Sequence, residues 1–193
     1  MKVRTLLTSL LVVAVVGACS GGKDDAASPV VTPGDGPSGG TIVTVGAVQL
    51  SLPAQMEPLE GDDGGSGITK GRYRSTVQDD HGRAAAVVVP VADQAQRAAK
   101  AEGEALVGYQ KDVAKGTDLR SGPIDWPGFE SAYGIEYDAA GAQAGDPLHN
   151  LVVVASTKEG GLVNVSVAAP PTLFDSLQLK AAVASLQPAR VRS

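Results

Sequence analysis

The pattern of apolar and polar residues divides the chain into three parts. An apolar run occupies residues 6–16, residues 20–40 contain mainly Gly, Pro, Ser, Ala and Asp without periodicity, and patterned sequence begins at Thr41. A segment that cannot bury apolar surface does not offset the entropy of ordering. We therefore predict a signal peptide over 1–18, a flexible tether over 19–40 and one domain over 41–193.

Short alternating or β-branched stretches predict most of the domain's structure. Each is five to eleven residues long and is bounded by Gly, Pro, Asn or Asp, as strands commonly are. Between two of them, Asp79-Asp80-His81-Gly82 is typical of a hairpin turn. The predicted strands are 41–45, 48–52, 69–79, 83–91, 118–124, 130–138, 148–157 and 162–168.

Two segments have helical rather than strand periodicity. Residues 92–115 are rich in Ala, Gln, Lys and Glu, and their apolar positions include Ala99 and Leu106; residues 172–187 follow Pro170-Pro171 and place Leu179 and Val183 on one face. Alanine dominates the first helix's apolar face, so we expect it to lie close against a sheet. Most connections have hairpin length, which favours an antiparallel sheet with helices packed on it, an α+β fold.

The apolar run near the start predicts export. Its eleven residues follow a short basic segment and precede Gly17-Ala18, whereas a spanning helix needs ~20 residues, so a transmembrane anchor is the weaker interpretation. Val16-Gly17-Ala18-Cys19 resembles the lipobox of bacterial lipoproteins. That resemblance implies that diacylglycerol is attached to Cys19 and that the chain is cleaved before it; an ordinary secretory signal with an incidental cysteine, or a buried structural cysteine, is the alternative.

The order of elements carries a second resemblance. The chain resembles the LpqN/LpqT-type lipoproteins of actinobacteria in the order of its segments. These are the lipobox, the tether, the strand ending at Pro53, the long helix after Pro90, and the sequence from Gly161 to Pro170 before a last helix. The resemblance covers about residues 42–188. It implies a PsbP-like α/β/α sandwich that acts as a binding or adaptor module at the cell envelope, and it supplies no catalytic residues.

Composition narrows the possible partners. The chain of 193 residues has a formal charge of −5 and a single cysteine, so it has no excess of basic residues to neutralise phosphates and cannot form an internal disulfide. We therefore expect no nucleic-acid partner and an attachment to the membrane that depends on acyl chains, which hold a protein stably when two are present. The expected location is the extracytoplasmic face of the cell membrane.

Aromatic residues gather in one region. Trp126, Phe129, Tyr133 and Tyr137 are four of the seven aromatics, and aromatic rings with polar atoms suit a pocket or a partner surface. The sequence makes them candidates for ligand or partner binding, while their alternative role is the core of an alanine-rich domain.

Other candidate chemistry is weaker. Gly61 to Gly67 lacks the residues of a phosphate loop or a calcium loop, and His81 and His149 have no metal-ligand or triad spacing around them. We predict no catalytic residue, metal or cofactor. The sequence favours a lipid-anchored, non-catalytic binding or adaptor module whose ligand is a protein or an apolar envelope molecule; the alternative is an envelope hydrolase whose site is assembled across loops.

Overall fold

The computed structural model describes residues 28–59, 71–93, 95, 97–140 and 147–189. Cys19, the predicted signal peptide and the segment from Gly61 to Gly67 lie outside the described residues. No helix among the described residues is long and apolar enough to cross a membrane.

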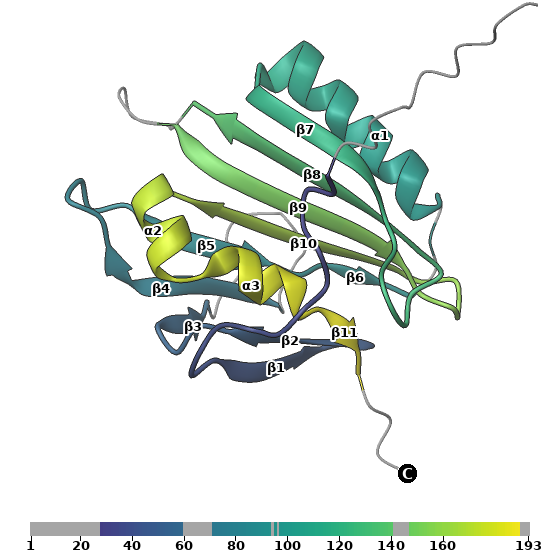
Figure 1. Cartoon of the computed structure of the whole chain (residues 1–193), viewed down its shortest axis with the longest axis horizontal. Helices are drawn as coiled ribbons and strands as arrows, with labels where there is room; N and C mark the ends of the chain where they lie inside the picture. The colour runs from purple at the N-terminus through teal and green to yellow at the C-terminus, as the bar shows by residue number, and fades with distance from the viewer. Residues whose placement is uncertain (1–27, 60–70, 94, 96, 141–146, 190–193) are drawn as a thin grey trace, which may run out of the picture.

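A large antiparallel sheet forms the centre of the fold (Figure 1). Its strands lie in the order β3-β4-β5-β10-β9-β8-β7, and the two-residue β6 pairs with β10. The predicted hairpin over residues 79–82 is confirmed, because it joins β4 to β5. The bounds are β3 Met56–Pro58, β4 Arg72–Gln78, β5 Ala84–Val88, β6 Val91–Ala92, β7 Thr117–Ile124, β8 Ser131–Ala139, β9 Leu148–Ser156 and β10 Leu162–Ala169.

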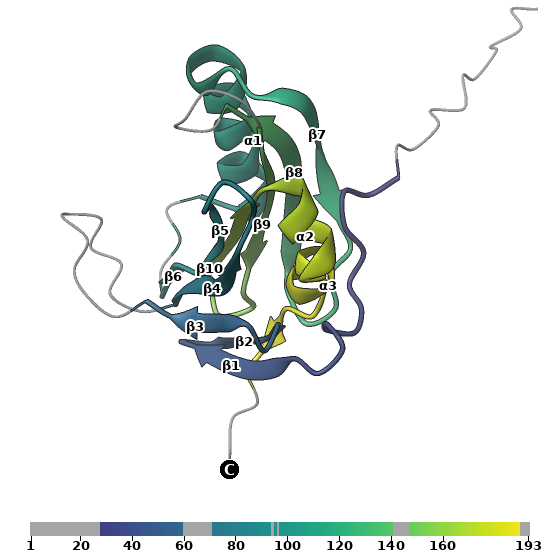
Figure 2. The same ribbon diagram turned by 90° about the vertical axis from the view of Figure 1, so that its left-hand side faces the viewer.

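Helices lie on both faces of this sheet, as Figure 2 shows from the side. On one face is α1 (Ala99–Tyr109), which continues as a π-helical turn, Gln110–Ala114. On the other face are α2 (Pro171–Ser176) and α3 (Leu179–Ala184). The prediction of one last helix over 172–187 is wrong, because Gln178 takes a left-handed conformation with φ 53° and separates two short helices. The α+β prediction is confirmed.

A second, three-stranded sheet has the order β1-β2-β11. It contains β1 (Thr41–Val45), β2 (Val48–Leu52) and β11 (Gln187–Pro188). Gly46 has φ 55° at the first central position of the two-residue turn between β1 and β2, a conformation that favours glycine. Along β2, alternate residues Val48, Leu50 and Leu52 are buried, so one face of this small sheet closes the core.

The core has two parts, one on each face of the large sheet. The larger part lies between the sheet, α2, α3 and the small sheet, and includes Leu50, Leu151 and Phe174. The smaller part lies under α1 and includes Ala99, Tyr133, Ile135 and Val154. Only Ala99 and Gly103 of α1 are buried, so the helix lies close to the sheet, as its alanine-rich face predicts.

The predicted tether is wrong in its second half. Residues 28–40 form a strap across the larger core: Val31 is 2% exposed, and Val30 packs against β8 at Gly134. The Gly34 N–H donates a hydrogen bond of 3.0 Å to the Ala184 carbonyl at the end of α3. Two adjacent valines thus bury enough apolar surface to order a segment that is otherwise rich in Gly and Pro.

Candidate functional site

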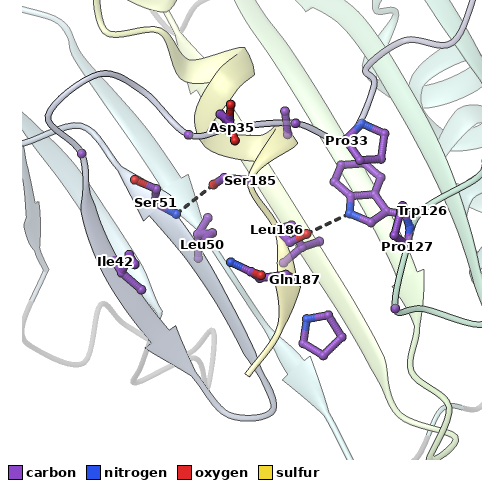
Figure 3. Close-up of a pocket in the computed structure, with 16 residues that line it drawn as sticks. Pro33, Asp35, Ile42, Leu50, Ser51, Trp126, Pro127, Ser185, Leu186 and Gln187 are labelled. Carbon is purple, nitrogen blue, oxygen red and sulfur yellow. Dashed lines mark hydrogen bonds between the residues drawn. The ribbon is translucent and has the colours of Figure 1, made fainter. Parts of the chain in front are cut away.

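An open groove crosses the outer face of the small sheet, beneath the strap (Figure 3). Its volume is about 680 Å³, and its walls come from four segments of the chain. These are the strap, β1 and β2, the turn after β7, and the segment from α3 to β11. The lining residues that the following paragraphs use are Asp35, Gly36, Ile42, Ser51, Trp126 and Gln187.

The strap lies against β2 and the end of α3, and these two elements are bonded to each other. The Ser51 N–H donates a hydrogen bond of 2.8 Å to Ser185 Oγ, and that hydroxyl donates to the Ala182 carbonyl at 2.7 Å. Gly36 permits the close approach, because a Cβ there would lie 2.4 Å from Ser51 Cβ. One wall of the groove is therefore a fixed part of the fold.

Trp126 forms the opposite wall. Its side chain is only 3% exposed, and its indole N–H donates a hydrogen bond of 2.8 Å to the Leu186 carbonyl. The indole N–H thus has its hydrogen-bond partner, and the apolar ring is buried, both within the protein. Trp126 shapes the groove and fixes the segment that leads into β11, rather than offering a free ring face.

The four aromatic residues that the sequence singles out do not form one surface. Trp126 and Phe129 are buried in the larger core, whereas Tyr133 and Tyr137 lie on the opposite face of the large sheet, in the smaller core beneath α1. Burial raises the pKa of the Tyr137 phenol. Of the four, only Trp126 lines the groove, so their main role in the structure is packing.

A cluster of charged residues crosses β7, β8 and β9 on the face covered by α2 and α3. Glu136 is 5% exposed and forms ion pairs with Arg120 and, at 3.7 Å, with Lys180. His149 lies between two carboxylates: its Nδ1 is 2.7 Å from Asp138 Oδ1, and its Nε2 is 3.0 Å from Glu136 Oε1. The sequence places these residues far apart, and only the antiparallel register brings them together.

This cluster fastens the helical layer to the sheet. The His149 ring also packs edge-on against Phe174 of α2, with centroids 4.4 Å apart, while Lys180 reaches the cluster from α3. A buried carboxylate is tolerated when opposite charges and hydrogen bonds surround it. A histidine that acts as a general base needs one ring nitrogen directed at a nucleophile, but both nitrogens of His149 face carboxylates. The arrangement therefore suits cohesion between layers.

The other histidine lies in the β4–β5 hairpin. The Asp79 side chain accepts hydrogen bonds from the backbone N–H groups of His81 and Arg83 and pairs with the Arg83 guanidinium at 2.8 Å. Desolvation raises the pKa of Asp79, but these hydrogen bonds and the nearby positive charge outweigh it and lower that pKa overall. Among the described residues, no group of three or more His, Cys, Asp and Glu side chains is arranged to hold a metal ion.

The fold defines the class of structure to which this arrangement belongs. An antiparallel sheet with α1 on one face and α2 and α3 on the other is a PsbP-like α/β/α sandwich, the architecture that the resemblance to LpqN-type lipoproteins implies. No protein-family model matches the chain, and no curated protein matches its sequence.

Two solved structures illustrate the similarity. The cyanobacterial PsbP protein CyanoP from Synechocystis sp. PCC 6803 is 15% identical, with a TM-score of 0.53, and the match covers 77% of this chain and 92% of that one. LpqN of Mycobacterium tuberculosis, described as involved in cell envelope biogenesis, is 14% identical, with a TM-score of 0.51, and the match covers 82% of this chain and 90% of that one. At these identities the similarity concerns the fold.

Proposed function

We propose that the protein is an exported, lipid-anchored binding module of the cell envelope that takes its ligand in the groove beneath the strap. The observation that carries this proposal is the groove itself. Its volume of about 680 Å³ lies within the range of ~300–1,000 Å³ that ligand sites occupy, and hydrogen bonds hold its walls in place before any ligand arrives. A preformed site loses less conformational freedom on binding.

The envelope location rests on the chain's first residues and on its fold. The apolar run and the lipobox-like Val16-Gly17-Ala18-Cys19 support export and acylation at Cys19. The similarity in fold to LpqN, which is described as involved in cell envelope biogenesis, is consistent with a role in the same compartment. Two acyl chains on Cys19 would hold the protein at the membrane stably.

Anchoring is tested by Cys19→Ala, with Ser20→Ala as the matched control. We expect the Cys19 variant to move from the membrane fraction to the soluble exported fraction, because the acceptor sulfur is gone, while the Ser20 variant stays with the membrane. Immunoblots of fractionated cells measure this distribution. A Cys19→Ala protein that remains in the membrane fraction would exclude the lipid anchor.

Ligand binding in the groove is tested by site-specific photocrosslinking in living cells. A photoreactive amino acid replaces Gln187, which projects into the groove, or Val113, which is 64% exposed on the opposite side of the large sheet. We expect a discrete crosslinked product from position 187 and none from position 113. Equal products from both positions, or none from 187, would contradict binding in the groove.

The sequence makes a hydrolase the second candidate function, but the contacts of His149 do not support it. Hydrolysis by a histidine-activated nucleophile requires a free ring nitrogen, and both nitrogens of His149 have carboxylate partners. We therefore propose the non-catalytic binding module.

A further inference from the structure

Strand β1 has a free outer edge. It is the terminal strand of the small sheet, and Thr41, Ile42 and Thr44 are exposed, with Ile42 66% exposed. Val45 pairs with Val48 across a two-residue turn, so Val45 and every second residue before it direct their backbone groups toward β2. The backbone N–H and C=O groups of Ile42 and Thr44 consequently point away from the sheet. Among the described residues, no strand pairs with this edge.

The other sheet edges carry features that discourage pairing with another chain. The edge strand β3 has three residues and ends in Pro58, and β11 has two residues and also contains a proline. The edge strand β7 contains Pro123 and the charged Arg120, and its register with β8 shifts. Charges, prolines, shortness and irregularity are the usual protections of edge strands. Strand β1, with the sequence Thr-Ile-Val-Thr-Val, contains no proline and no charged residue, and its only protection is its modest length.

The groove begins at this edge. The Ile42 side chain projects from the outer face of β1 and lines the groove, as Figure 3 shows, so a chain added beside β1 would run along the groove's rim. Asp35 on the strap is the only charged residue among those that line the groove, and the chain has a net charge of −5. The groove therefore favours a neutral or basic occupant.

We propose that the outer edge of β1 accepts an extended segment of a partner protein as an added strand, and that this segment is rich in β-branched residues and carries a basic residue for Asp35. Main-chain hydrogen bonds to Ile42 and Thr44 supply affinity, while contacts with Ile42 and the groove supply selectivity. The inference rests on the proposed function, because it names the partner of the same groove.

A second copy of this chain fits the edge less well. Pairing β1 with β1 of another copy joins two five-residue strands, and such a contact is short for the ~1,200–2,000 Å² that stable protein interfaces bury. Both copies would also carry the same net negative charge. A basic extended segment avoids the repulsion between like charges, and its contacts with the groove add to the short contact with β1.

Amide hydrogen exchange measured by NMR tests the added strand residue by residue. The probe is the synthetic peptide Lys-Thr-Val-Thr-Val-Thr-Lys, titrated into the isotopically labelled protein. At saturation we expect exchange at the Ile42 and Thr44 amides to slow at least tenfold, because only these amides gain a partner. Exchange at Val43 and Val45, whose amides already face β2, should change little. No peptide-dependent slowing at Ile42 and Thr44 would overturn the inference.

Three variants separate strand addition from other binding. Thr44→Pro removes an N–H that points outward and leaves the hydrogen bonds to β2 in place. Ile42→Lys leaves the backbone intact but adds a positive charge that repels the basic peptide. We expect both to weaken peptide binding at least tenfold, and Thr41→Ala, on the same strand, to bind within twofold of the wild type. Equal binding by all three variants would overturn the inference.

Two further outcomes distinguish this inference from the proposed function. A crosslinked ligand at position 187 together with unchanged exchange at Ile42 and Thr44 would refute the added strand but leave binding in the groove intact. Slow exchange at both amides without peptide, together with a dimer by light scattering, would replace the partner segment by a second copy and so overturn the inference as stated.

Discussion

Replacing Trp126 tests whether one side chain supports both the core and the groove. Trp126→Ala removes a side chain that is 3% exposed and leaves the Leu186 carbonyl without its hydrogen bond. Loss of a large buried aromatic costs about 3–5 kcal/mol, and an unsatisfied buried acceptor adds about 1 kcal/mol. Small domains have a free energy of unfolding of only about 5–15 kcal/mol, so the variant should lose a large part of its stability.

Urea unfolding followed by far-ultraviolet circular dichroism measures this change. Fluorescence cannot serve both proteins, because Trp126 is the only tryptophan in the chain. Trp126→Phe is the matched variant: it retains an aromatic ring but loses the indole N–H, so its destabilisation should be smaller, about 1–3 kcal/mol. A loss below about 1 kcal/mol for Trp126→Ala would refute the assignment of this residue to the core.

Two further predictions concern α1 and the β4–β5 hairpin. Gly103→Ala should lower the free energy of unfolding by about 1–3 kcal/mol, because its Cβ would lie 2.3 Å from Tyr133 Cδ1, whereas Gly108→Ala, with no atom within 4 Å, should be neutral or stabilising by up to about 1 kcal/mol in the same denaturation assay. Equal effects of the two would contradict the close contact of α1. Asp79→Asn should lower the melting temperature at neutral pH, because the pKa of Asp79 is lower in the folded protein than in the unfolded chain. The ionised carboxylate therefore stabilises the fold at any pH above its pKa in the unfolded chain, and this stabilisation is lost as the pH falls through its pKa in the folded protein. Melting curves of both proteins should converge as the pH drops below 3.8, and a constant difference would contradict the prediction.

Local sequence patterns contain most of the information for the large sheet. Strands β8, β9 and β10 follow one another with short connections, so each strand's pattern and its turns specify the pairing with its neighbour. The strand predicted over 83–91 is instead β5 and β6, because the pairing with β10 is interrupted around Pro90. The short β3 and β11 give no periodic signal, since two or three residues cannot show one.

The groove was not predictable in the same way. Its walls join the strap, the turn at Trp126 and the segment leading into β11, which are distant in sequence and individually resemble ordinary loops. Val30-Val31 was the one signal that the strap is ordered, and two residues within a Gly- and Pro-rich segment are too few to outweigh that composition. Of the four aromatic candidates, Trp126 does line the groove, but the four residues form no common surface because the large sheet separates two of them from the other two.

The contacts that close the small sheet and the strap affect when the chain is able to fold. The Ser38 N–H bonds to the Gln178 side chain 140 residues later, and Ser51 bonds to Ser185 across 134 residues. Contacts between residues so distant in sequence slow folding, because a long loop must close before they form. The central strands are able to pair earlier, but the groove is complete only after almost the entire chain has emerged. A chain of this topology that crosses a membrane in extended form would thus complete its groove at the end of translocation, on the far side.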